Sequence, residues 1–334
     1  MPVSIKDIAQ KAGVSPSTVS RALNDHPRIS QETKTYIQNL ARSMGYIPST
    51  VARNLVTRRT ATIGVAIADL TDPYYGRLML GIDDAAAAHN YQVLLSCFYR
   101  DPDRELALVH DFHKRRVDGI IVLGSEAESA YSDPDQNFFM PIVLVNRPGY
   151  RCSVSVDRNV GGQMVVDYLV SLGHRRIAFI TGGARQRIRS RRLAGYRQAL
   201  ARHHIPYNPD LVVDGDGEIS GGIRAANQLL SLSPPPTAVF CFNDMTAIGV
   251  INALRRQGFR VPDDFSVVGF DDLEMTAYYS PALTTVRQPT HEVGERAFDM
   301  LSRLIRHQPV EPEMLNPELV IRASTTSAAQ PLTA

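Results

Sequence analysis

Short apolar runs alternate with amphipathic segments from Thr62 onward, and this alternation restricts the fold of most of the chain. Eight runs have the length and β-branched composition of buried strands, and helical patterns lie between most of them. Such an alternation predicts right-handed βαβ units, and therefore an α/β body of parallel sheets flanked by helices. Because so many units need two sheets, we infer two lobes. The expected strands are residues 63–68, 92–96, 119–123, 142–145, 153–156, 177–181, 238–242 and 266–269, and the expected helices are 75–89, 103–115, 159–172, 190–203, 219–231 and 244–257.

The first 46 residues show a different, all-α pattern of three short helices. Apolar residues recur at helical spacing in the first helix, Gly13 tolerates the positive φ of a tight turn, and Ser15 can cap a second helix that begins at Pro16. A third helix is expected between Ser30 and Gly45. Two helices joined in this way predict a helix-turn-helix, whose second helix reads the major groove of DNA. A helical hairpin that contacts another protein is the alternative.

The outer side of the second helix carries the candidate DNA contacts. Val19 and Leu23 are expected to pack on the first helix, which leaves polar side chains at the N-terminal end. Residues 1–60 contain nine basic and three acidic residues, a charge of +6, whereas the remainder contains 27 basic and 31 acidic residues, a charge of −4. A basic head suits contacts with DNA phosphates. The candidates are Ser15, Pro16, Ser17, Thr18, Ser20, Arg21 and Asn24.

The chain has room for two or three domains with substantial cores, because 44% of its 334 residues are hydrophobic. We expect the helix-turn-helix head at 1–46 and a linker at 47–60, in which residues 49–56 form a short helix that needs a partner to be stable. The body occupies 61–334. Its first lobe is expected at about 61–157 and 287–316, and its second lobe at about 158–286 and 317–326.

Polar and aromatic side chains follow most of the expected strands. Ligands of parallel α/β folds bind beyond the carboxyl ends of the strands, so we expect these side chains to share a site. Together they supply carboxylate, amide, guanidinium and aromatic groups, which suit a polyhydroxylated small molecule. For each one alone, a role as a helix cap or a hydrogen-bonded surface group is equally consistent with the sequence. The candidates are Tyr74, Tyr75, Ser125, Asn146, Arg192, Asn243, Asp271 and Gln288.

Five arginines lie between residues 185 and 192, although the body is acidic overall. If a helix begins near Ser190, Arg189 and Arg192 lie one turn apart and can point into the same site. Two guanidinium groups there would favour a carboxylate or phosphate on the ligand, as in a sugar acid or sugar phosphate, over a neutral sugar. A solvated basic loop is the alternative interpretation.

No motif of the sequence predicts an enzyme or a membrane protein. The chain has no phosphate-binding loop, nucleophile elbow or dinucleotide-binding glycine motif. Asp271 and Asp272 are adjacent and are expected to point in opposite directions rather than flank one bond. His110 and His113 have no third ligand nearby in sequence and the three cysteines are widely spaced, so we expect no metal or other cofactor. The absence of an apolar signal core and of a stretch of roughly 20 apolar residues favours a cytoplasmic location.

Seven motifs occur in order along the chain, at residues 5–9 (IKDIA), 14–21 (VSPSTVSR), 45–48 (GYIP), 172–178 (LGHRRIA), 242–244 (FND), 267–272 (VVGFDD) and 283–289 (LTTVRQP). This ordered set resembles the lactose-repressor (LacI/GalR) family of bacterial transcription regulators. The resemblance implies a body like that of periplasmic sugar-binding proteins, which binds an effector such as a sugar or sugar acid. It also implies a homodimer, most often a repressor, whose heads bind a pseudo-palindromic operator in double-stranded DNA.

The resemblance further implies roles for single residues. Positions that contact base edges in the family are matched by Pro16, Ser17 and Arg21, and the hinge leucine that inserts into the minor groove is matched by Leu55. Effector contacts of the family are matched by Arg192, Asn243, Asp271 and Gln288, with Asn146 and residues 73–75 expected to line the same site.

Two features depart from the family pattern. Pro16 offers no hydrogen-bond donor at a base-reading position, so the operator of better-known members does not transfer to this chain. Residues 323–328 are small and polar without leucine heptads, so we expect no tetramer-forming extension. Two other classes explain less of the sequence. A secreted sugar-binding transport protein would need a signal peptide and no basic head, and a sugar-processing enzyme would need a positioned nucleophile or acid/base pair.

Overall fold

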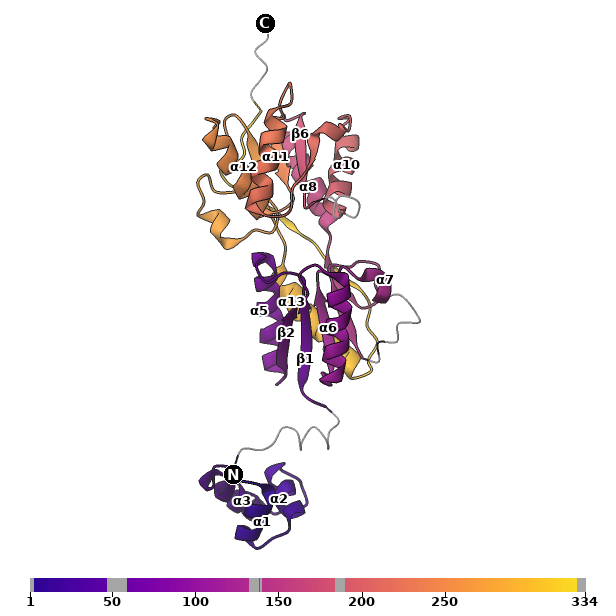
Figure 1. The fold of residues 1–334 in the computed structure, drawn as a ribbon, viewed down its shortest axis with the longest axis vertical. Helices are drawn as coiled ribbons and strands as arrows, with labels where there is room; N and C mark the ends of the chain where they lie inside the picture. Colours follow the sequence, from indigo (N-terminus) through magenta and orange to yellow (C-terminus); the bar gives the residue numbers. More distant parts are fainter. Residues whose placement is uncertain (1–2, 47–58, 132–137, 139, 184–189, 329–334) are drawn as a thin grey trace. The chain divides into compact units, whose positions relative to one another are not determined.

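A computed structural model describes residues 3–46, 59–131, 138, 140–183 and 190–328. The chain forms two compact units, Met1–Thr60 and Ala61–Ala334, which are drawn in Figure 1 and described separately below. Two expected site residues, Leu55 and Arg189, lie outside the described residues.

The described part of the first unit contains the helices α1 (Ile5–Ala12), α2 (Pro16–Leu23) and α3 (Gln31–Ser43) (Figure 1). Ser15 caps α2 as expected, because its Oγ accepts a hydrogen bond from the backbone N–H of Thr18 at 3.1 Å. Gly13 ends α1 in the left-handed region, at φ 67°. The predicted helix-turn-helix is therefore confirmed. Its core consists of Ile8, Ala9, Val19, Ala22, Ile37 and Ala41.

The first lobe of the second unit is built on a parallel sheet with the strand order β11-β5-β4-β3-β1-β2. Helices cover both faces: a Cβ on Gly64 would collide with Phe112 of one helix, and a Cβ on Gly119 would collide with Leu301 of another, from opposite sides of the sheet. The strands are β1 (Thr62–Ile67), β2 (Gln92–Cys97), β3 (Gly119–Leu123), β4 (Ile142–Val145), β5 (Ser153–Val156) and β11 (Glu313–Leu315), and the helices are α5 (Pro73–Ala88), α6 (Pro102–Lys114), α7 (Glu128–Tyr131) and α13 (Thr290–Ile305).

The second lobe is built on a parallel sheet with the order β7-β6-β8-β9, and an antiparallel pair, β10-β12, lies against its edge through bridges at Val268–Thr284 and Asp271–Arg287. The strands are β6 (Ile177–Thr181), β7 (Val212–Asp214), β8 (Ala238–Cys241), β9 (Ser266–Val268), β10 (Thr285–Arg287) and β12 (Glu318–Val320), the helices are α8 (Arg158–Ser171), α10 (Arg191–Arg202), α11 (Ile219–Leu230) and α12 (Asp244–Arg256), and two short 3₁₀ helices are η1 (Pro209–Leu211) and η2 (Glu274–Ala277).

The chain passes between the two lobes at three places: from β5 to α8, from β10 to α13, and from β11 to β12. Arg158 is the first helical residue after the first crossing, and Gln288 lies on the second. Figure 1 shows these segments joining the two sheets. Residues on the crossings are placed to respond when the lobes move relative to each other.

The eight expected strands and the six expected body helices all lie where the structure has them, within a few residues at each end. The helices α7 and α13 and the strands β7, β10, β11 and β12 were not predicted from the sequence. Each of the missed strands has only three residues, so an alternating pattern is too short to recognise. The α/β body of parallel sheets flanked by helices is confirmed.

Candidate functional site

The N-terminal end of α2 presents a group of hydroxyls. Ser15 Oγ lies 2.7 Å from Ser17 Oγ and 2.8 Å from Thr18 Oγ1, so the capping residue also orients its neighbours. Ser15, Pro16 and Ser17 are exposed, whereas Thr18 is half-buried. Ser17 therefore offers an exposed hydroxyl group in the first turn.

Arg21 is exposed, and in the described part of the chain no carboxylate lies within 4 Å of its guanidinium group. Asn24 is also exposed, but its side-chain Nδ2 donates to the backbone oxygen of Ser20 at 2.8 Å, so it helps to end α2. Ser20 is half-buried. Of the expected DNA contacts, Arg21 has the charge and the freedom that direct base recognition needs.

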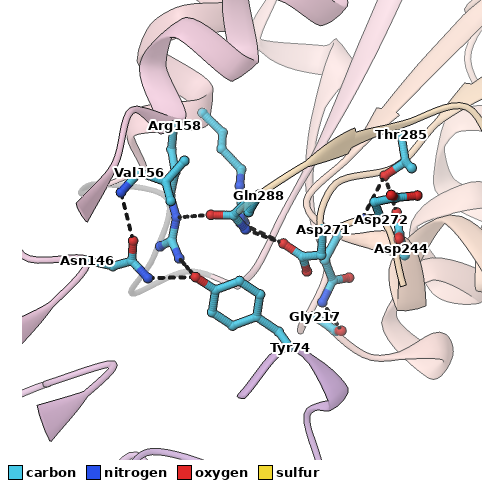
Figure 2. A network of polar contacts seen from close by, with 12 residues as sticks. Tyr74, Asn146, Val156, Arg158, Gly217, Asp244, Asp271, Asp272, Thr285 and Gln288 are labelled. Carbon is cyan, nitrogen blue, oxygen red and sulfur yellow. Dashed lines mark hydrogen bonds and ion pairs between the residues drawn. The ribbon is translucent and has the colours of Figure 1, made fainter. Parts of the chain in front are cut away.

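A second group of polar side chains lies where strands of the body end, and Figure 2 shows it from close by. Tyr74, at the start of α5, is buried, and its Oη accepts hydrogen bonds from Asn146 Nδ2 at 2.7 Å and from Arg158 Nη2 at 3.2 Å. Asn146 follows β4 with φ at 61°, and its Oδ1 accepts from the backbone N–H of Val156 at 3.2 Å. Tyr74 Oη thus connects the start of α5 with the residue after β4, through Asn146, and with the start of α8, through Arg158. Asn146 adds the end of β5 to this network.

Arg158 continues this network into the second crossing. Its Nε donates to Gln288 Oε1 at 3.3 Å, and Gln288 Nε2 donates in turn to Asp271 Oδ1 (Figure 2). Arg158 was not among the predicted site residues, because it lies two residues beyond the end of β5, after Asp157, which caps α8. The structure therefore joins Tyr74, Asn146, Asp271 and Gln288, as expected, and adds Arg158.

Arg192, near the start of α10, is buried, and its Nη2 lies 3.3 Å from Asp271 Oδ1. Its guanidinium carbon lies 4.3 Å and 4.0 Å from the ring centroids of Phe242 and Phe270. Burial, together with the nearby charge of Arg158, lowers the pKa of Arg192 to about 10. Arg192 is thus a rigidly held, dehydrated cation that faces one carboxylate.

The Asp271 carboxyl is buried as well, and its desolvation raises its pKa to about 7 despite the attraction of Arg192 and Arg158. Its backbone has φ at 114°, a strained conformation for a residue with a side chain. Strain of this kind persists where the surrounding structure enforces it, and it often marks functional sites. The carboxyl is therefore close to the point where it gains or loses a proton at neutral pH.

Asp272 points away from Asp271, as expected. It pairs with Arg287 Nε at 2.7 Å and with Arg322. Burial alone would raise the pKa of Asp272, but the hydrogen bonds from both arginines outweigh burial and lower it. The two adjacent carboxyls therefore do not form an acid/base pair that flanks one bond.

The remaining expected site residues do not bond to this network within the described residues. Asn243 caps α12, with Nδ2 donating to Gly217 O at 2.8 Å and Oδ1 accepting from Thr246 N at 2.9 Å. Tyr75 is buried beside Gly124, where a Cβ would collide with its Oη. Ser125 is fully buried, and its Oγ has no hydrogen-bond partner in the described part of the chain.

Among the described residues, no group of three or more His, Cys, Asp or Glu side chains is arranged to hold a metal ion. No described helix combines the length and the apolar character needed to cross a bilayer.

Comparisons with known proteins show the family of the chain. A family model described as "Bacterial regulatory proteins, lacI family" matches residues 4–49, and one described as "Periplasmic binding protein-like domain" matches residues 166–325. The HTH-type transcriptional repressor CytR of Escherichia coli (strain K12) is 36% identical over 327 residues, which are 96% of each chain. The chain belongs to the lacI family of bacterial regulatory proteins. The lacI-family chain is therefore a DNA-binding transcription regulator, which confirms the family expected from the motifs.

Two solved structures illustrate the likeness of the fold. The lac repressor dimer bound to operator and the anti-inducer ONPF has a TM-score of 0.88 with this lacI-family chain at 29% identity, covering 98% of this chain and 100% of that one. The transcriptional regulator CelR in complex with cellobiose has a TM-score of 0.73 at 29% identity, covering 96% of this chain and 99% of that one.

Proposed function

We propose that this lacI-family regulator is a repressor that binds a pseudo-palindromic operator as a homodimer, and that a polyhydroxylated small molecule bound between the lobes controls its affinity for DNA. The observation that carries the proposal is the network of Tyr74, Asn146, Arg158, Gln288 and Asp271, which joins both lobes and two of the three crossings. Such a network offers donors and acceptors to hydroxyl groups on several sides. Two relatives support the proposal: CytR is named a transcriptional repressor, and CelR was solved in complex with cellobiose.

The head supplies the DNA contacts in this proposal. Arg21, Ser17 and Pro16 face the base edges, while Ser15, Thr18, Ser20 and Asn24 support the recognition helix or reach phosphates. Leu55 inserts into the minor groove at the centre of the operator, an assignment that rests on the family resemblance. The basic charge of residues 1–60 supplies the salt-dependent part of the affinity.

In the body, Arg192 and Asp271 bind ligand hydroxyls, with Gln288, Asn146 and Tyr74 completing the contacts. The proposal also assigns effector contacts to Tyr75 and Asn243, which the family resemblance implies, to Ser125, which follows a strand, and to Arg189, which is expected one helical turn from Arg192. A ligand there must replace some of the hydrogen bonds between the lobes, so it favours one relative position of the lobes over another. The relative position of the lobes sets the extent to which the linkers of both subunits are ordered. The affinity for DNA then changes with this order.

The homodimer forms through a face that runs along α5, β2 and η2. Large apolar side chains are exposed on these elements: Leu80 is 60% exposed, Leu95 38% and Tyr278 84%. Arg77 of α5 lies 3.6 Å from Glu274 of η2, so the parts of this face on the two lobes are neighbours. Exposed apolar groups on both lobes suit a subunit interface that spans the two lobes. The contacts across such an interface change when the lobes move relative to each other.

Electrophoretic mobility shift tests the proposal, with operators selected from a randomised pool and measured at 50 and 200 mM salt. A regulator loses affinity steeply with salt, by roughly 10³ or more if six phosphates are contacted. Addition of sugars and sugar acids should change the remaining affinity. A transport protein or an enzyme would show neither effect, and an enzyme would also consume the added sugar. We place this activity in the cytoplasm, where chromosomal DNA is accessible.

A further inference from the structure

The charge of Arg158 has no close counter-charge. The guanidinium group has five N–H donors, of which the described structure engages one at Nε and one at Nη2. Both acceptors, Gln288 Oε1 and Tyr74 Oη, are neutral oxygens. Within the described residues no carboxylate oxygen lies within 4 Å of Arg158, and the Tyr74 ring, 5.6 Å from the guanidinium carbon, fixes its direction.

The neighbouring carboxylates are engaged elsewhere. Asp271 contacts Arg192 and accepts from Gln288. Asp72, the cap of α5, lies 3.7 Å from Arg100, which also lies 3.5 Å from Asp69. Since each acidic group has its own partner, Arg158 adds a positive charge to the polar network that the protein does not neutralise by contact.

Burial opposes the positive charge of Arg158, but Tyr74 and Asp271 raise its pKa overall, so the guanidinium group stays charged although no described carboxylate contacts it. Packing enforces its position, because Gly162 and Gly195 allow α8 and α10 to approach so closely that a Cβ on either would collide with the backbone of the other helix. Arg158 is the first residue of α8 and Arg192 the second of α10, and burial together with the charge of Arg158 depresses the pKa of Arg192. The fold therefore holds two cations side by side at the site that we assign to the effector.

We propose that Arg158 binds an anionic group of the effector, so that the effector is a polyhydroxylated molecule carrying a carboxylate or a phosphate. This inference rests on the proposed effector site and narrows its ligand class. Arg158 supplies the charge-assisted hydrogen bonds to the anion, and Asp271 with Arg192 binds the hydroxyl groups. It assigns to Arg158 the second-cation role that the sequence suggested for Arg189.

Calorimetric titration and thermal denaturation of the full chain test this inference with matched probes: D-glucose, D-glucuronate and D-glucose 6-phosphate, and D-ribose, D-ribonate and D-ribose 5-phosphate, at constant ionic strength. We expect at least one acidic probe to bind and raise the Tm of the wild type, while its neutral counterpart binds at least about tenfold more weakly. The affinities of the sugar acids and of the sugar phosphates show which anionic group the site prefers.

The variants are Arg158→Met, Arg158→Lys and, as a matched control, Arg151→Gln, which removes the charge of an exposed arginine. Arg158→Met should lose the preference for the acidic probe, Arg158→Lys should keep part of it, and Arg151→Gln should keep all of it. A merely structural arginine would lower the Tm of Arg158→Met without changing the ratio of acidic to neutral affinity.

The inference would be overturned if wild type and Arg158→Met had the same ratio of acidic to neutral affinity, or if no acidic probe stabilised the wild type. If one of these results is found while a neutral sugar binds the wild type and not Arg192→Met, the effector site stands and the anion assignment alone fails.

Discussion

Arg158 Nε and Gln288 Oε1, 3.3 Å apart, connect two of the three places where the chain passes between the lobes. Because each residue is fixed to a different crossing, a ligand that breaks or strengthens this hydrogen bond acts directly on the hinge of the body. Arg158 also reaches the buried Tyr74 at the start of α5, the helix whose exposed side we assign to the homodimer. A local change of hydrogen bonding in the network can thus reach the second subunit through packed elements.

Arg21→Ala should weaken binding to a selected operator and broaden the preference for bases at one position. An arginine that donates two hydrogen bonds to guanine contributes roughly 1–3 kcal/mol of discrimination. Selection of randomised sites with both proteins measures the preference, and Lys11→Ala, on α1, provides a control for loss of charge in the head. An unchanged base preference in Arg21→Ala would show that α2 does not recognise bases through this residue.

Arg192→Met and Asp271→Asn should each abolish the response of operator binding to effector. Each substitution breaks the buried pair at 3.3 Å and leaves its partner without a counter-charge, which costs affinity for any ligand held by both. Titration of effector against a protein–operator complex measures the response. If both variants still respond with the affinity of the wild type, the effector binds elsewhere.

The pKa of Asp271, raised from 3.8 to about 7, predicts a specific dependence of stability on pH. A carboxyl whose pKa is higher in the folded than in the unfolded state stabilises the protein fully below the unfolded value, and this contribution is lost as the pH rises through the folded value. Between pH 4 and 7 the wild type should therefore lose stability relative to Asp271→Asn, by an amount on the order of a few kcal/mol. Parallel Tm profiles of the two proteins over this range would refute the shift.

The charged and titratable groups that face Asp271 come from several elements: Arg192, Arg158, Asp72, Tyr74 and Asp244. Asp244 is also buried, and both burial and the charge of Asp271 raise its pKa. The difference between the two profiles therefore reports Asp271 together with its coupling to Asp244.

Leu80→Glu should weaken the homodimer and with it the affinity for a two-half-site operator. Leu80 is 60% exposed on α5, so a charge there costs little in the monomer but places unpaired charge in an apolar interface. Analytical ultracentrifugation measures the dissociation constant, and Glu292→Gln on α13 serves as an exposed control. A dimer of unchanged strength would exclude α5 from the interface.

The amino-acid sequence predicts those parts of this structure that depend on local pattern. The caps Ser15 and Ser30 and the apolar runs of β1, β3 and β6 could be located because each has a periodicity or a cap of its own. Strands β10, β11 and β12 have three residues each and owe their conformation to pairing with distant segments, so no local signal marks them.

The polar network could be predicted in part for the same reason. Asn146, Asp271 and Gln288 follow apolar strands and were selected by that position. Arg158 follows Asp157, which fits a helix cap, so its position at the network depends on the turn between β5 and α8 rather than on its own neighbours. Asn243 was selected by the strand-end rule, yet its hydrogen bonds with Gly217 and Thr246 show the cap role that the sequence left open.

Control of DNA binding by the effector is tested by the affinity of the full chain for its selected operator, measured by fluorescence anisotropy at fixed salt with and without each probe sugar, sugar acid and sugar phosphate. We expect a probe that binds the body to change the operator affinity of the wild type by at least about fivefold, a typical allosteric coupling, and to leave that of Arg192→Met unchanged. An operator affinity that stays constant while the probe saturates the body would contradict this control.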